Sequence, residues 1–163
     1  GKTNVNSFTF QYDQNQLQDR MNVRVQKVGD QISLDNAVLK LKIRGFDSGN
    51  HLMNKDLYHL LDAEKYPHVL IDFKSLIPEL QNSPQSSLTA IARVRMAGES
   101  HNEKIEVNYK PSKNKDLFHY VGKTTLNLYN YDIEPPVKFM GLVKVQNELV
   151  IQFNLRFEAE RNS

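Results

Sequence analysis

Apolar and polar residues alternate one by one through most of this chain, and the clearest example lies near its C-terminus. In ELVIQFNLRFEAE (148–160), every second residue from Leu149 to Phe157 is apolar, whereas the residues of the other parity from Gln152 to Glu158 are polar. Successive side chains of a β-strand point to opposite faces of a sheet, so this period of two predicts a long strand with one buried face.

The same period recurs in three other segments. Odd positions in 39–43 and 105–109, and even positions in 88–96, are apolar, while most residues between them are polar. Each of these segments therefore predicts another half-buried strand. Ala90 and Ala92 lie in the middle of one of these apolar faces. Because their side chains are small, we expect them to leave space in the interior.

Turn sequences separate the alternating runs. They are VGDQ (28–31), NSPQSS (82–87), AGESHN (97–102), PSKNKD (111–116), EPPV (134–137) and QNE (146–148). Runs of about ten residues between such turns outline seven or eight antiparallel strands in a single domain spanning residues 1–163. Long strands with a single helix favour a closed barrel over a sandwich, because closure removes exposed strand edges.

The segment KDLYHLLDAEKYPHVLIDFKSL (55–76) changes its hydrophobic period in the middle. Apolar residues up to Leu61 have helical spacing, and strict alternation follows from Val69. Pro67 lies between these two patterns. Proline cannot continue a helix, and it holds the preceding residue in an extended conformation, so the helix must end before this position.

We expect this helix at about 55–63, with Asn54 placed to cap its first turn. A helix this short is unstable alone, so its apolar side chains must pack on the barrel, across one end or against the side. The residues expected to face the barrel are Leu57, Leu60 and Leu61, and those expected to face solvent are Lys55, His59 and Asp62.

Composition narrows the class of partner. The chain has 21 Lys and Arg against 19 Asp and Glu, and the basic residues are scattered along it, so a nucleic-acid partner gains no support. The absence of cysteine excludes disulfides and thiolate metal sites. No apolar run is long enough for a transmembrane segment. The chain begins at Gly1 without a signal-peptide pattern, which we interpret as a trimmed or processed N-terminus.

No segment carries a convincing catalytic or metal-binding pattern. GESHN (98–102) is similar to a nucleophile elbow around Ser100, but Asn102 replaces the second glycine and the segment falls in an expected hairpin turn. We therefore expect no enzyme, no metal and no cofactor. The histidines lack metal-ligand spacing and are His51, His59, His68, His101 and His119.

Three longer segments resemble one known family. They are HLMNKDLYHLLDAEKYPHVLIDFKSL (51–76), LTAIARVRMAGESHNEKIEVNY (88–109) and YDIEPPVKFMGLVKVQNELVIQFNLRFE (131–158). Their sequence and order resemble the YceI-like domain family, whose members are similar in fold to lipocalins. The resemblance implies a bacterial, periplasmic or secreted protein that holds a polyisoprenoid or other lipid in its barrel.

We thus predict an all-β protein, an antiparallel lipocalin-like β-barrel of about eight strands with one short α-helix. Two departures from the family pattern bear on the barrel. Residues 1–13 either form its first strand, or that strand is incomplete. Asn130 and Tyr131 stand where many relatives have a hydroxyl, so the cavity would differ in shape if these residues border it.

The predicted function is non-catalytic binding or carriage of an elongated apolar ligand, an isoprenoid or acyl lipid. The alternative is a filled barrel that acts as a protein-interaction module. Arg93 and Arg95 alternate with the apolar face and are either solvated or placed to pair with a lipid phosphate near the rim. The residues predicted to line the cavity are Leu39, Leu41, Ile43, Ile71, Phe73, Ala90, Ala92, Val94, Tyr120, Phe153, Leu155 and Phe157.

Overall fold

A computed structural model describes most of the chain. The described residues are 8–12, 23–78, 87–110, 113, 117–134 and 147–158. Within them, the side chains of 8–11, 117–118 and 153–158 are not described. The predicted inward directions of Phe153, Leu155 and Phe157 therefore lie outside the described side chains.

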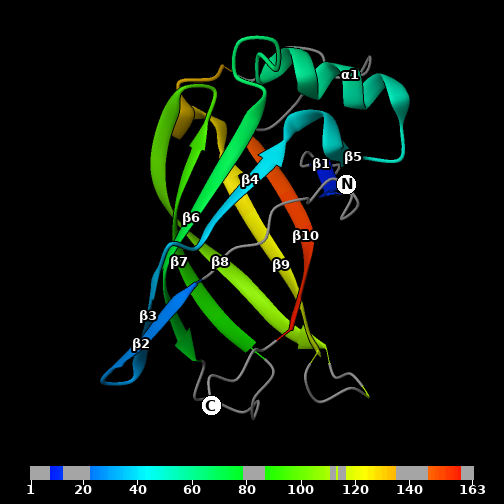
Figure 1. Ribbon diagram of the computed structural model, residues 1–163. Coiled ribbons are helices and arrows are strands. Elements are labelled where there is room, and N and C mark those ends of the chain that lie inside the picture. The colour runs from blue at the N-terminus through cyan, green and yellow to red at the C-terminus, as the bar shows by residue number, and fades with distance from the viewer. Residues whose placement is uncertain are drawn as a thin grey trace, which may run out of the picture.

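The described chain forms one ten-stranded sheet, one α-helix and short 3₁₀ turns (Figure 1). The helices are α1 (His51–Leu60), η2 (Ile43–Gly45) and η3 (Leu128–Tyr131). The strands are β1 (Phe8–Tyr12), β2 (Arg24–Val28), β3 (Gln31–Asp35), β4 (Val38–Lys42), β5 (Phe46–Asp47), β6 (His68–Pro78), β7 (Ser87–Met96), β8 (Glu99–Lys110), β9 (Leu117–Asn127) and β10 (Glu148–Glu158).

The strand path of the described sheet is open, but near α1 a single segment pairs with strands on both of its sides. Its strand order is β2-β3-β6-β7-β8-β9-β10-β1-β5, and β4 pairs with β6. Only η2 separates β4 from β5, so the segment Val38–Asp47 pairs with β6 through β4 and with β1 through β5. Toward the other end, β3 replaces β4 as the strand that pairs with β6. The other edge of β3 pairs with β2. No ladder of the described residues joins β2 to β10 or β1.

The expected antiparallel, lipocalin-like barrel with one short helix is confirmed as the fold class, with two differences. The described sheet has ten strands and its strand path is open. In addition, β1 pairs in parallel with β10. The sequence left open whether residues 1–13 contribute the first strand of the barrel. Residues 8–12 do form a strand of the barrel.

The end of β1 is fixed by a buried tyrosine. The hydroxyl of Tyr12 accepts a hydrogen bond from the backbone N–H of Lys42 at 3.1 Å. Its ring meets that of Phe46 edge-on, with 5.1 Å between the centroids. Two segments distant in sequence are thereby joined beside η2, where β4 leaves β6.

The parity predicted from the alternation is confirmed wherever the side chains are described. Leu39, Leu41, Ile43, Ile71, Phe73 and Ile151 are all buried. The intervening Lys40, Lys42 and Arg44 are exposed. Ile43 lies in η2 rather than in a strand, but its side chain still points inward.

A β-bulge in β6 changes the parity beyond Phe73. Phe73 pairs with Ala92, and the register shifts before Ser75 pairs with Ile91 and Leu76 with Ala90. The extra residue of the bulge lets Leu76 instead of Ser75 take the inward position. An apolar residue thus stays on the inner face although the local alternation of the sequence has changed.

The helix begins four residues earlier than expected, so the predicted span of 55–63 and the cap at Asn54 were wrong. Asn50 is the N-cap, and its side chain accepts hydrogen bonds from the backbone N–H groups of Leu52 and Met53. The side chain of Asn54 accepts from the N–H and hydroxyl of Ser48 instead. The helix ends at Leu60, and Asp62 follows with a φ of 52°.

Helix α1 lies across the end of the barrel (Figure 1). Leu57 and Leu61 are 1% and 0% exposed and belong to the barrel core. Leu60 is only partly buried, so its predicted barrel-facing position is only partly realised. Lys55, His59 and Asp62 are exposed, as expected.

Candidate ligand cavity

The inward side chains become more exposed toward the end of the barrel away from α1. On β6 and β7, Phe73 and Ala90 are buried, whereas Leu76 and Leu88 beyond them are only partly buried. On β9, Leu126 is buried and Tyr120 is partly buried. In the sheet β6 and β7 are neighbours and β8 lies between β7 and β9, and the gradient has the same direction on all three strands. Among the side chains that the structure describes, those pointing inward are therefore closely packed beside α1 and more exposed toward the opposite end.

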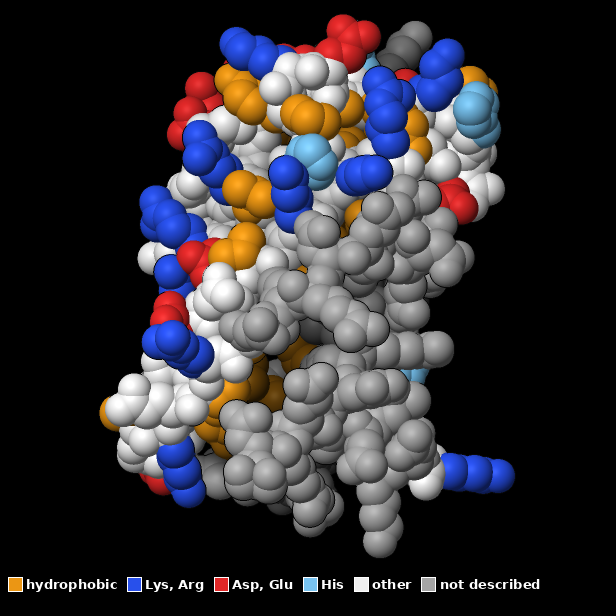
Figure 2. Space-filling model, in the orientation of Figure 1, with side chains coloured by type: hydrophobic (Ala, Val, Ile, Leu, Met, Phe, Trp, Pro, Cys, Tyr) orange, Lys and Arg blue, Asp and Glu red, His pale blue; other side chains and the backbone are white. Residues whose placement is uncertain are grey.

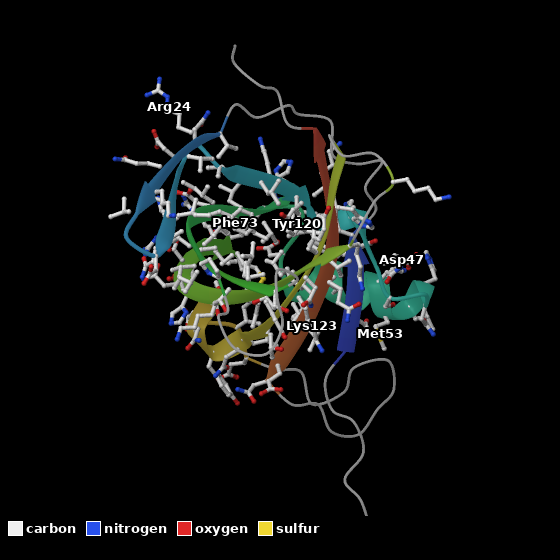
Figure 3. The ribbon with its side chains drawn as sticks, turned by 90° about the horizontal axis from the view of Figure 1, so that it is seen from below. Arg24, Asp47, Met53, Phe73, Tyr120 and Lys123 are labelled. Atoms are coloured by element: carbon white, nitrogen blue, oxygen red, sulfur yellow. The ribbon has the colours of Figure 1, made fainter. Side chains whose placement is uncertain are left out.

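Small inward residues mark the transition between the two halves. Ala90 and Ala92 lie on β7, and Gly122 lies on the inward parity of β9 between Tyr120 and Thr124. Because none of the three small residues has a side chain beyond Cβ, the wall recedes here. Phe73 and Tyr120 project from the wall into the interior as seen along the barrel (Figure 3).

Figure 2 shows a hollow in the surface below the middle of the molecule, with hydrophobic side chains visible inside it. It lies toward the end away from α1, where β2 and β3 diverge from the rest of the sheet (Figures 1 and 2). The exposure gradient and the hollow therefore point to the same end. We take the inner face at this end as the candidate ligand cavity.

A polar cluster lies at the opposite, packed end. The hydroxyl of Tyr131 donates to Glu103 Oε1 at 2.8 Å, and His101 Nδ1 lies 3.1 Å from the same oxygen. Tyr131 is 1% exposed. Burial, and then the hydrogen bond to Glu103, raise the pKa of the Tyr131 hydroxyl well above its ordinary value. This cluster satisfies a carboxylate that would otherwise be costly inside the barrel.

Sequence reasoning missed this cluster, although a signal was present. Glu103 shares its parity with Ile105 on β8, so strict alternation already placed its carboxylate on the inner face. Tyr131 was considered only as a departure from the family pattern. The structure gives it a definite packing role, because η3 carries its ring into the barrel core.

A separate recess of about 420 Å³ lies beside the end of α1. Carboxylates dominate its polar lining, which includes no Lys or Arg. They are Asp62, Glu99, Asp132 and Glu134. An apolar ligand would gain little here, and an anionic head group would be repelled. We therefore do not place the ligand in this recess.

The described members of the predicted cavity set divide between the two halves of the barrel. Leu41, Ile43 and Val94 are fully buried in the core near α1. Ala90, Ala92 and the partly buried Tyr120 lie at or beyond the transition. Their inward direction is established, while a role in holding a ligand stays a prediction. Leu34, Leu76 and Leu88 border the less filled half and were absent from the predicted set.

The arginines singled out in the sequence lie on the outer face. Arg93 and Arg95 are exposed, and Arg93 Nη1 donates to Asn102 Oδ1 at 3.3 Å. Arg95 neighbours Leu70 across the ladder, and Lys40 neighbours Leu70 from the other side. Both arginines belong to the half of β7 nearer α1, so we do not assign them a phosphate at the open end.

Strand register gathers on this face basic residues that are scattered in the sequence. Figure 2 shows many Lys and Arg side chains over its described part. Burial, and then the charges of Lys40 and Lys42, lower the pKa of His68 below its ordinary value. The positive charge of this face is carried by its Lys and Arg side chains.

The catalytic candidate weighed in the sequence, Ser100, lies next to a hairpin turn. Ser100 lies on β8 just after a tight hairpin turn, in which Ala97 and Gly98 have φ values of 51° and 82°. A Cβ at Gly98 would come within 3.0 Å of the ring of Tyr66, so this position requires glycine. Ser100 therefore belongs to a hairpin and not to a strand-to-helix elbow. Among the helices that the structure describes, none is long and apolar enough to cross a membrane.

Taken together, the fold and the site define a lipocalin-like barrel with a helix across its packed end. No family model and no curated protein matches the sequence. Solved structures do match, among them BcnA of Burkholderia cenocepacia, with a TM-score of 0.60, 14% identity and coverage of 85% of this chain and 84% of that one.

The YceI protein of Campylobacter jejuni matches with a TM-score of 0.54 and 10% identity, covering 89% of this chain and 84% of the other. A mutant of that protein gives the same values. At such identities the likeness concerns the fold. The chain therefore has a YceI-like fold, and the resemblance found in its sequence is confirmed at that level.

Proposed function

We propose that this protein binds or carries an elongated apolar ligand, an isoprenoid or acyl lipid, in the less filled half of its barrel. The observation that carries the proposal is the exposure gradient of the inward apolar side chains toward one common end. A monomeric domain gains nothing from apolar side chains left partly exposed inside a barrel. A ligand chain lying against them would complete their burial.

The free energy of such binding is adequate. Each buried methylene contributes about 0.8 kcal/mol, so burial of about ten carbons gives roughly 8 kcal/mol before the cost of ordering the chain is subtracted. That gross value corresponds to a Kd of about 1 μM. A prenyl or acyl chain of ordinary length exceeds ten carbons, and no polar anchor is required.

The proposal includes the absence of chemistry on the ligand. The hydroxyl of Ser100 lies in a hairpin, and the Glu103 carboxylate is engaged by Tyr131 and His101. On the described inner face of this half, Leu, Ala and Phe side chains supply most of the contact area. Carriage is therefore the function that these residues support best.

A filled barrel that acts as a protein-interaction module is the second candidate. It is favoured by the half of the barrel beside α1, where Leu41, Val94 and Leu126 are no more than 1% exposed. If the less filled half were equally packed in solution, the interior would have no room for a ligand. Ligand binding itself discriminates between the two functions.

A steric substitution tests the proposal. Ala90→Phe places a ring on the inner face at the transition, and binding of a fluorescent acyl or prenyl probe should fall at least about tenfold. Ile91→Phe is the matched control, because Ile91 is the adjacent residue and points outward on the same strand. Equal probe binding by the wild type and both variants would overturn the cavity. The melting temperature shows that each variant is folded, and Ala90→Val serves if the ring is too large.

We also propose a periplasmic or secreted location. The support is the likeness to the YceI-like fold together with the family resemblance of the sequence. Fractionation of cells of the native host, with an antibody against this chain, tests the location directly. Recovery of the protein only with cytoplasmic markers would contradict it.

A further inference from the structure

Within the part of the chain that the structure describes, one buried hydroxyl has no hydrogen-bond partner. Thr124 lies on β9 between Gly122 and Leu126 on the inward parity and is 3% exposed. Its Oγ1 has no hydrogen-bond partner in the part of the chain that the structure describes. Buried polar side chains are almost always hydrogen-bonded, so this exception requires an explanation.

Packing alone does not explain the hydroxyl. Threonine and valine have nearly the same shape, and valine would fill the same position on β9 without a buried polar atom. The flanking inward residues satisfy the ordinary pattern, since Leu126 is apolar and Gly122 has no polar side-chain atom. A buried hydroxyl without a hydrogen bond destabilises the native state. A hydrogen bond from a bound ligand would remove this penalty.

The hydroxyl lies on the inner face of β9, next to the position where the wall recedes. The next inward position toward the open end is Gly122, which has no side chain, and beyond it lies the partly buried Tyr120. On β7, two strands away, the inward Ala90 and Ala92 are also small. A chain that enters from the open end and follows β9 therefore passes over Gly122 before it meets Thr124.

The surroundings restrict the chemistry of the group that Thr124 could bind. On the described inward faces of β4 and β6 to β10 there is no Lys or Arg. Glu103 is also inward, but its carboxylate already accepts from Tyr131. An anionic end group at Thr124 would be buried without a counter-charge, which is unfavourable. A threonine hydroxyl can donate one hydrogen bond and accept others. It can therefore bind a neutral group that is a hydrogen-bond acceptor, a donor or both.

We propose that Thr124 is a hydrogen-bonding subsite for the ligand, and that the ligand is an apolar chain whose inserted end carries one neutral polar group, a hydroxyl or a carbonyl. This inference rests on the proposed function. It goes further because it assigns the orientation of the chain, with the polar end inside, and excludes a charged inserted end.

The test compares 1-dodecanol with tridecane, two chains of equal heavy-atom number that differ by one hydroxyl. Binding of each is measured by displacement of a fluorescent apolar probe. Thr124→Val should weaken dodecanol binding about five- to tenfold, the loss expected for one hydrogen bond, and leave tridecane binding unchanged. Thr124→Ser should retain dodecanol binding.

Thr125→Val is the matched control, because Thr125 is the adjacent residue and is exposed on the outer face. If Thr124→Val leaves the ratio of the two affinities unchanged while both chains bind, the subsite is overturned and the cavity stands. If neither chain binds to the wild type, the proposed function itself is overturned. Thr124→Ala gives the same comparison should the valine variant fail to fold.

Discussion

Two polar side chains inside the barrel, Glu103 and Thr124, differ in their hydrogen bonding. Glu103 is paired with Tyr131 and His101 beside α1, whereas the Thr124 hydroxyl, farther from α1, has no hydrogen-bond partner among the described residues. A buried carboxylate without partners would destabilise the fold more than a lone hydroxyl. The paired group therefore stabilises the packed half of the barrel, and the other is the group that we propose to bind the ligand.

The hydrogen bond between Tyr131 and Glu103 has a measurable effect on stability. Tyr131→Phe removes the hydroxyl that donates to a mostly buried carboxylate, so the free energy of unfolding should fall by about 1–3 kcal/mol. Chemical denaturation measures the change. Tyr129→Phe is the control, because Tyr129 is also in η3 but is 62% exposed, and it should have little effect.

The same pair predicts a pH dependence. The Tyr131 pKa is raised in the folded state above its ordinary value of 10.0, so folding favours the protonated hydroxyl. Its contribution to stability is complete below about pH 10 and is lost as the pH rises toward the folded-state pKa. The wild type should therefore lose stability above pH 10 more steeply than Tyr131→Phe. Parallel pH curves for the two proteins would contradict the assignment.

At the scale of elements, helix α1 is anchored by a narrow apolar stripe. Leu57→Ala should lower the free energy of unfolding by about 2–5 kcal/mol, because Leu57 is 1% exposed within the barrel core. Leu60 is only partly buried, so Leu60→Ala should cost less. Leu52, which is 62% exposed on the same helix, provides the control. Equal effects of Leu57→Ala and Leu52→Ala on denaturation would mean that the helix is not docked as described.

Local sequence patterns predicted which residues of the strands point inward. The errors arose where contacts between distant segments determine the structure. The inward parity of Leu41, Ile71 and Ile151 follows from alternation, which is a local property of the chain. The helix start was misplaced because Asn50 and Asn54 are both suitable caps, and the bonds of Asn54 to Ser48 favour the earlier one. The β6 bulge coincides with a change of alternation after Phe73, but only the pairing with β7 shows that the strand continues through this change.

At the scale of the whole molecule, the sequence predicted a barrel but not which end is packed. Closure beside α1 depends on the segment Val38–Asp47, which pairs with strands on both sides. Parallel pairing of β1 with β10 joins segments from opposite ends of the chain. Neither arrangement has a signal in the spacing of residues. At the other end, β2 is the last strand of the described order, and no described strand pairs with its outer edge.

The most direct test of an apolar cavity at this end uses a single tryptophan as reporter. The chain has no tryptophan, so Tyr120→Trp places one fluorophore at a partly buried inward position toward the open end. Titration with 1-dodecanol should shift its emission to shorter wavelength and saturate at one ligand per protein, because the bound chain displaces water from the ring. Tyr129→Trp at the packed end should show no shift. An unchanged emission of Tyr120→Trp, or an equal shift in both variants, would contradict the cavity.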